Sequence, residues 1–201
     1  MNADEIERTL RAGALDLEQF DIAPDPYLQE RLRNFCLASG LLSKTGQQGA
    51  VVDALQLVGP HVSLPDDMVN AYVAGTLADF IRHELLDGGA TFTFETVMSS
   101  PDKADFMAEA LQRGYRTYLY FVGTSSPDIN VDRVAKRVQA GGHPVPVERI
   151  RERYGKSLQN LEDACASATR AYGEIPGWLG DTSLIRKVVE QWAVPQADQL
   201  P

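Results

Sequence analysis

The polar groups that could do chemistry follow two apolar segments in the middle of the chain. Glu95 and Thr96 lie at the end of an alternating β-branched and aromatic segment, residues 91–97, and Gly123-Thr124-Ser125 follows the continuous apolar run 117–122. Open α/β sheets bind ligands at the carboxyl ends of their strands, so Glu95 and Thr96 are candidate contacts for a substrate hydroxyl or a metal. The Glu95 carboxylate could instead cap the helix that follows.

A segment rich in arginine is the second candidate, because it lies in an otherwise acidic chain. Its basic or titratable residues surround a loop broken by glycine and proline: Arg133, Arg137, His143, Arg149, Arg151 and Arg153. The planar guanidinium binds two phosphate oxygens at once and stays charged, which favours phosphate binding. Apolar residues at helical spacing from Ile150 to Tyr172 leave open a second interpretation, in which these arginines occupy a solvated helix face. His143 could bind phosphate or be a hydrogen-bonding loop residue.

A βαβ unit is the arrangement that would position these groups. Residues 91–97 and 117–122 are predicted to be parallel strands, the second covered on both faces, joined by a right-handed crossover. The crossover helix begins at Pro101 and ends at Gly114. Its inward positions are Phe106, Met107, Ala110 and Leu111. Another helix begins at Ser126-Pro127-Asp128 and ends at Gly141-Gly142.

The residues before this unit are predicted to be mostly helical. Asn2 or Asp4 caps a helix that continues to Arg11. Further helices are expected over 27–39, 49–58 and 66–87. We interpret residues 16–65 as a helical insertion within a single domain, 1–194, that is followed by a disordered tail, 195–201. Cys36 and Cys165 each lie on an apolar helical stripe, which predicts buried, reduced thiols.

Composition limits the classes of function. With 201 residues, 44% of them hydrophobic and 23% charged, the chain is typical of one soluble globular domain. Its net charge of −9 argues against duplex nucleic acid as a partner, because phosphate contacts need a basic surface, although the local arginines suit a nucleotide. No apolar leader and no run of membrane-spanning length are present, so we expect a cytoplasmic protein with no membrane partner.

The motifs in this chain resemble those of the zeta-toxin-like family of P-loop kinases, in the branch labelled predicted ABC-type ATPase. The matching pieces, in the order of the family, are Asn2-Ala3-Asp4-Glu5-Ile6, Phe92-Thr93-Phe94-Glu95-Thr96-Val97-Met98-Ser99, Gly114-Tyr115-Arg116, Tyr118-Leu119-Tyr120-Phe121-Val122-Gly123-Thr124, Arg133-Val134, Arg137-Val138, Gly141-Gly142-His143, Val145-Pro146, Arg153-Tyr154 and Ser157-Leu158. The resemblance implies a P-loop fold and phosphoryl transfer from ATP, with Mg²⁺, to a small-molecule hydroxyl. In the toxins of the family, this hydroxyl belongs to a UDP-N-acetylamino sugar.

The resemblance also implies roles for individual residues. Asp4 matches the general base that takes the proton of the acceptor hydroxyl, and Glu95, with Thr96, matches the substrate-side position. The region from Arg133 to Arg153 matches the phosphate-binding lid. Within this lid we assign Arg137 and Arg153 to the transferring phosphoryl group, and Arg133, His143 and Arg151 to the nucleotide. These groups are expected to converge on one cleft, and an antitoxin and a homo-oligomer are candidate partners.

Two departures from the family bear on activity. The family has a glycine-rich P-loop strand before the Asn-Ala-Asp-Glu motif, which here follows Met1 directly, so we expect no tight binding of ATP. The segment Ala38–Thr45 ends in Lys-Thr but lacks both glycines and follows a helical pattern. The late strand expected after Ala171-Tyr172 is also predicted to be absent.

These observations predict an incomplete α/β fold with a P-loop kinase-like parallel sheet, flanked by helices and carrying a helical insertion. Two functions follow from this prediction. One is an ATP-dependent phosphotransferase. The other is a degenerate, catalytically inactive binding or regulatory relative, or a truncated gene product, that does not bind ATP.

Overall fold

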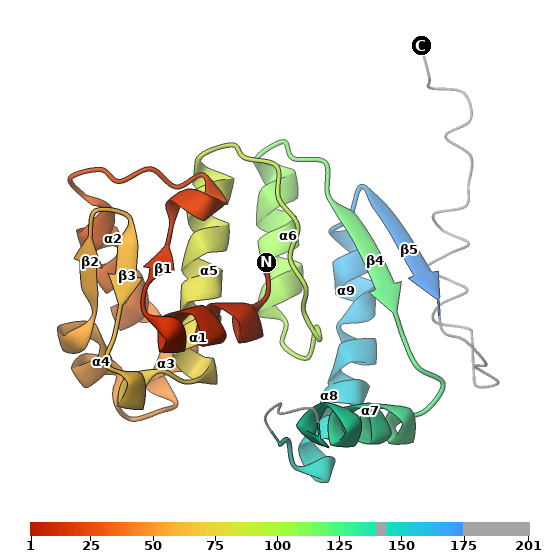
Figure 1. Ribbon diagram of the computed structural model, residues 1–201. Coiled ribbons are helices and arrows are strands. Elements are labelled where there is room, and N and C mark those ends of the chain that lie inside the picture. The colour runs from red at the N-terminus through yellow and green to blue at the C-terminus, as the bar shows by residue number, and fades with distance from the viewer. Residues whose placement is uncertain (140–143, 175–201) are drawn as a thin grey trace. The chain divides into compact units, whose positions relative to one another are not determined.

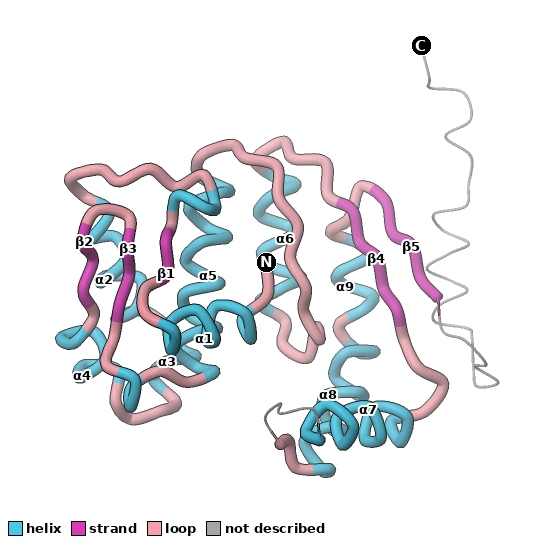
Figure 2. Tube along the Cα trace, viewed as in Figure 1, coloured by secondary structure: helices cyan, strands magenta, loops and turns pink. Residues whose placement is uncertain are grey.

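The computed structural model describes residues 1–139 and 144–174 of the chain (Figure 1). Contacts between Cα atoms divide the chain into two units, Met1–Glu95 and Thr96–Pro201. The described residues form a mixed α/β structure that is mostly helical, with one small antiparallel sheet and one small parallel sheet (Figure 2). None of their helices combines the length and the apolar character needed to cross a membrane.

The first unit combines helices with a three-stranded antiparallel sheet. Its elements are α1 (Ala3–Ala12), β1 (Leu15–Asp16), η1 (Glu18–Phe20), α2 (Leu28–Ala38), α3 (Gly40–Ser43), α4 (Gln48–Ala54), β2 (Gln56–Val58), β3 (His61–Ser63), η2 (Asp66–Met68) and α5 (Ala71–Asp87). The strands lie in the order β1-β3-β2, with Val62 of β3 opposite both Leu15 and Leu57. Residues 16–65 therefore contain strands as well as helices, and the helix predicted over 49–58 ends at Ala54, because Gln56–Val58 form β2.

Helix α5 is the central helix of the first unit. Its side chains are buried around most of its circumference, because α1, α2 and α3 all pack against it. Phe80, which is 1% exposed, meets the ring of Phe35 edge-to-face, with the centroids 5.6 Å apart. The predicted helix over 66–87 begins later than expected, because a short 3₁₀ turn, η2, comes first and Asn70 then caps α5.

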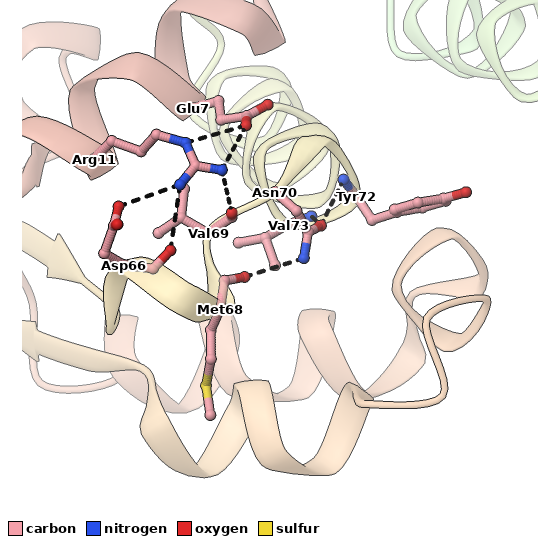
Figure 3. Close-up of polar contacts among 8 residues, drawn as sticks. All are labelled: Glu7, Arg11, Asp66, Met68, Val69, Asn70, Tyr72 and Val73. Carbon is pink, nitrogen blue, oxygen red and sulfur yellow. Dashed lines mark hydrogen bonds and ion pairs between the residues drawn. The ribbon is translucent and has the colours of Figure 1, made fainter. Parts of the chain in front are cut away.

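Arg11 fixes the C-terminal end of α1 to the connection before α5 (Figure 3). Its guanidinium donates to the Glu7 carboxylate, to the carboxylate and carbonyl of Asp66, and to the Val69 carbonyl, at 2.6 to 3.3 Å. The residue after Val69 is Asn70, whose carboxamide oxygen accepts hydrogen bonds from two backbone N–H groups of α5. Since Ile6 and Leu10 of α1 are also buried, this helix has a defined position on α5.

The second unit contains a two-stranded parallel sheet. Its elements are α6 (Asp102–Gln112), β4 (Tyr118–Val122), α7 (Pro127–Gln139), α8 (Val147–Gln159), α9 (Leu161–Ala166) and β5 (Arg170–Glu174). Strand β4 pairs with β5, with Tyr120 opposite Tyr172. One face of the sheet, which includes the buried Leu119, packs on a cluster built from α6, α9 and Met98.

Several predictions about this sheet are wrong. The strand over 117–122 is present as β4, but it is not covered on both faces, since Tyr120 and Val122 are 72% and 76% exposed. Its parallel partner is β5 and not residues 91–97, which contain no assigned strand. The late strand is present, because residues 170–174 form β5 and do not continue a helix to Tyr172.

Local hydrogen bonds explain why β5 begins where it does. The side chain of Thr169 accepts from the Thr117 N–H at 3.0 Å, and the Thr117 hydroxyl oxygen accepts from the Thr169 N–H at 3.0 Å. This reciprocal pair sets the register immediately before β4 and β5.

The helices of the second unit are closer to prediction. Helix α6 has the expected position, but Leu111, which was predicted to face inward, is exposed. Helix α7 begins at Pro127, as expected. The predicted end of α7 at Gly141-Gly142 and the predicted tail, 195–201, lie outside the described residues.

Candidate functional site

Asp4 and Glu95 lie close to the same asparagine in the first unit. Asn2 caps α1, because its Oδ1 accepts the Asp4 N–H at 2.9 Å. The Nδ2 of the same side chain donates to Oε2 of Glu95 at 3.2 Å. All three side chains are exposed. The Asn2 carboxamide thus contacts the Glu95 carboxylate at one end and the backbone of Asp4 at the other, although these residues are 91 positions apart in the sequence.

Backbone bonds to Met1 hold the segment that carries Glu95. The Met1 nitrogen donates to the Thr93 carbonyl at 3.1 Å, and the Met1 carbonyl accepts the Glu95 N–H at 3.2 Å. These two bonds straddle Phe94, which is the hydrogen-bonding pattern of a parallel bridge. Residues 92–95 therefore have a strand-like partner at the beginning of the chain, although the pairing is too short to be assigned as a strand.

The alternating pattern of this segment determines which way Glu95 points. Phe92 and Phe94 are partly buried, whereas Thr91, Thr93 and Glu95 are exposed, as the period of two predicts. The guanidinium carbon of Arg82 lies 4.9 Å from the centroid of the Phe94 ring. Arg82 is itself buried and paired with Asp79 on α5. With Phe94 held on the buried side, Glu95 projects to the solvent and contacts Asn2. It does not cap α6, whose N-cap residue is Pro101.

Thr96 belongs to the second unit and has a local contact. Its Oγ1 accepts the Met98 N–H at 3.0 Å, in a turn where Met98 has a φ of 50°. The Met98 carbonyl accepts a hydrogen bond from Asn160 at 2.9 Å, which anchors the turn to the residue that joins α8 and α9. Thr96 therefore stabilises the beginning of the second unit, and its substrate-binding role stays a prediction.

The arginines of the predicted lid lie on two helices that contact each other. Arg133 and Arg137 are on α7, and Arg149, Arg151 and Arg153 are on α8, all exposed. Arg151 forms an ion pair with Asp128 of α7 at 2.8 Å. An exposed pair of this kind stabilises the protein little, so Arg151 could exchange Asp128 for a phosphate at small cost.

A partly buried hydrogen bond fixes α8 to the loop after β4. The Tyr154 hydroxyl donates to the Thr124 carbonyl at 3.0 Å, and partial burial raises the pKa of Tyr154.

His143 lies outside the described residues. The phosphate-binding roles of the lid residues, and their convergence with Asp4 and Glu95 on one cleft, stay predictions.

The segment Ala38–Thr45 does not fit the phosphates of ATP. The segment Ala38–Thr45 forms the short helix α3, which directly follows helix α2 and no strand. Ser39 caps α3, and the Thr45 hydroxyl donates to the Leu42 carbonyl at 2.8 Å. This confirms that the Lys-Thr pair is no phosphate loop, which would need strand, loop and helix in that order. Within the part of the chain that the structure describes, no His, Cys, Asp and Glu side chains gather in the groups of three that could hold a metal.

Both cysteines are buried and unpaired with each other, as predicted. Burial raises the pKa of Cys36 to about 11, and it does the same for Cys165. A thiol with so high a pKa is protonated at neutral pH and is a poor nucleophile. The cysteines thus have packing roles.

A shallow hollow of about 360 Å³ lies elsewhere in the first unit. It is lined by Pro24, Asp25, Pro26, Gln29, Leu57 and Gly59, none of which is a predicted site residue. Arg31 donates to the Asp25 carboxylate and lowers its pKa. The same guanidinium pairs with Glu84 of α5, so Asp25 has a clear structural role at the rim of the hollow.

Comparisons with known proteins give two matches. The family model described as Zeta toxin matches residues 67–172, which include Glu95 and the arginines of α7 and α8, whereas Asp4 precedes them. An uncharacterized protein of Haemophilus influenzae is 26% identical over 108 residues, which cover 51% of this chain and 77% of that protein. No solved structure gives a significant match.

Proposed function

Because the chain belongs to the zeta-toxin family, whose members are P-loop kinase-like proteins, we propose that it provides the acceptor side of a phosphoryl transfer from ATP to a small-molecule hydroxyl. The observation that supports this proposal is that the exposed Glu95 carboxylate accepts a hydrogen bond from Asn2, the residue that caps the helix turn on which the exposed Asp4 lies. The acceptor class that the family favours is a nucleotide sugar.

In this proposal the two acids have different roles. Asp4 accepts the proton of the attacking hydroxyl, which increases the nucleophilicity of that oxygen as it attacks phosphorus. Glu95 accepts a hydrogen bond from a neighbouring hydroxyl of the same sugar and so orients the attacking one. The exposure of both side chains leaves them accessible to a ligand that arrives from the solvent.

The arginines of α7 and α8 would meet phosphate groups. Arg137 and Arg153 are proposed to stabilise charge on the transferring group, and Arg133, Arg151 and His143 to bind the nucleotide. ATP with Mg²⁺ is the phosphoryl donor that the family implies. Because the Lys-Thr segment that includes α3 is not a phosphate-binding loop, the proposed roles are limited to the acceptor and to single guanidinium contacts.

A second candidate is a binding or regulatory protein without catalysis. The observation that favours it is that the segment Ala38–Thr45, which ends in Lys-Thr, follows a helix and is not a phosphate-binding loop. Such a protein would keep the acid pair and the arginines as ligand contacts only. An antitoxin or a second copy of the chain would then be the candidate partner.

An assay of phosphoryl transfer distinguishes the two candidates. The chain is incubated with millimolar γ-³²P-labelled ATP, Mg²⁺ and a panel of UDP-N-acetylamino sugars, and the products are separated by chromatography. We expect label in a sugar nucleotide that gains one phosphate, and less of it with Glu95→Gln. Absence of labelled product with every acceptor, together with no heat of Mg²⁺-dependent ATP binding by calorimetry, would support the second candidate.

A further inference from the structure

We propose that Asn2 is a positioning residue: its Oδ1 caps the helix on which Asp4 lies, and its Nδ2 orients the Glu95 carboxylate toward the start of that helix. This inference rests on the proposed function for its catalytic meaning. The geometry on which it depends is present in the protein without ligand.

The oxygen end of the carboxamide is anchored by the helix. Asn2 has the extended backbone of an N-cap residue, with φ of −135° and ψ of 128°, and its Oδ1 lies 2.9 Å from the Asp4 nitrogen. The Asn2 carbonyl also accepts the Ile6 N–H at 3.2 Å, which closes the first turn of α1. With Oδ1 fixed in this way, the direction of Nδ2 is fixed too, because the carboxamide is planar.

The backbone of Glu95 is fixed independently of Asn2. The two bonds to Met1 hold it from one side, and the contact between Phe94 and the buried Arg82 holds the neighbouring residue from the other. The remaining freedom lies in the three side-chain torsions of Glu95. The hydrogen bond from Nδ2, 3.2 Å from Oε2, selects among these rotamers and turns the carboxylate toward the N-terminus of α1.

A cap alone does not need asparagine. Serine, threonine and aspartate also accept the N–H of a first helical turn, and they cap about as well. Asparagine adds a neutral N–H donor on the same side chain. Such a donor attracts the Glu95 carboxylate, whereas a carboxylate at position 2 would repel it.

Substitutions of Asn2 can therefore distinguish a positioning role from a capping role. Asn2→Ser keeps the cap and removes the donor, Asn2→Asp keeps the cap and replaces the donor with a charge, and Asn2→Ala removes both. Circular dichroism and thermal unfolding should show the fold unchanged in the first two variants. Only Asn2→Ala should lose stability.

The readout is the side-chain conformation of Glu95, followed by NMR three-bond couplings and NOEs in the ligand-free protein. We expect one rotamer of Glu95 to dominate in the wild-type protein, averaging among rotamers in Asn2→Ser, and a carboxylate turned away from residue 2 in Asn2→Asp, because like charges repel. The exposed Glu30 of α2 serves as the internal reference and should keep its rotamer populations in all variants.

The result that would overturn the proposal is a Glu95 rotamer distribution that is identical in the wild-type protein and Asn2→Ser. The transfer assay is read separately. If the wild type transfers phosphate, Asn2→Ser should lower the rate by about tenfold or more at unchanged stability, since misplacement of a catalytic group is costly. If the wild type transfers none, the proposed function fails, while the rotamer measurement still decides whether Asn2 positions Glu95.

Discussion

Asp4→Asn is expected to lower the rate of phosphoryl transfer to an acceptor hydroxyl by about 10²- to 10⁴-fold, the usual contribution of a general base. The substitution keeps the size and shape of the side chain and leaves the Asp4 N–H in its bond to Asn2, so the first turn of α1 should persist. An amide cannot take the proton of the hydroxyl. Acceptor binding, measured by calorimetry, should change by no more than about threefold, because hydrogen bonds to the acceptor remain available.

Glu5→Gln is the matched control for this variant. Glu5 is the next residue, is equally exposed, and also lies in the first turn of α1. Each substitution removes one negative charge from the N-terminus of the helix, so both should lower thermal stability by a similar small amount. Equal losses of transfer rate in the two variants, or parallel losses of rate and acceptor affinity in Asp4→Asn, would make Asp4 a structural residue.

Phe80→Ala is expected to destabilise the first unit by about 3–5 kcal/mol, the range for removal of a buried phenylalanine side chain. Phe80 lies on the central helix α5, is 1% exposed and contacts the ring of Phe35. The substitution leaves a cavity among side chains that α2 and α5 hold in place. Urea unfolding followed by circular dichroism measures the loss.

Leu37→Ala is the control for this core substitution, because Leu37 is 53% exposed on α2. Its effect should stay within about 0.5 kcal/mol, as is usual for surface positions. The comparison tests whether α5 is the centre of the first unit. Similar losses in the two variants would contradict the packing of Phe80 in the core.

Local patterns in the sequence predicted the helices well. The cap at Asn2 and the apolar spacing of Ile6 and Leu10 are sufficient to place α1, and Leu28, Leu32 and Cys36 do the same for α2. These signals lie within one or two turns of the chain. The short strands β1, β2 and β3 were missed, because two or three residues carry no readable period.

Strand pairing could not be predicted, since it depends on partners that are distant in the sequence. The run over 117–122 correctly indicated β4, but its partner β5 has only the residues Arg-Ala-Tyr-Gly-Glu, which form no apolar run. Ala168 and Tyr172 continue the helical spacing of α8 and α9 by coincidence. The reciprocal bonds of Thr117 and Thr169, which begin the pairing, have no signal in a single sequence.

The surroundings of the candidate site residues could be predicted only in part, for the same reason. Asp4 and Glu95 were chosen by their resemblance to family positions, and the period of two in residues 91–95 indicates the outward direction of Glu95. The contact between Asn2 and Glu95 was missed. Asn2 could be recognised as a helix cap from its neighbours, but its bond to a residue 93 positions away depends on how Met1 pairs with the segment around Phe94.

NMR of the ¹³C,¹⁵N-labelled chain during titration with UDP-N-acetylglucosamine tests most directly whether Asp4 and Glu95 form the acceptor site. We expect saturable shifts of the Asn2 side-chain amide and of the Asp4 and Glu95 carboxyl carbons, with one common dissociation constant. Saturable shifts confined to the hollow around Pro26, Gln29 and Leu57, with the three site residues unmoved, would contradict the proposed function.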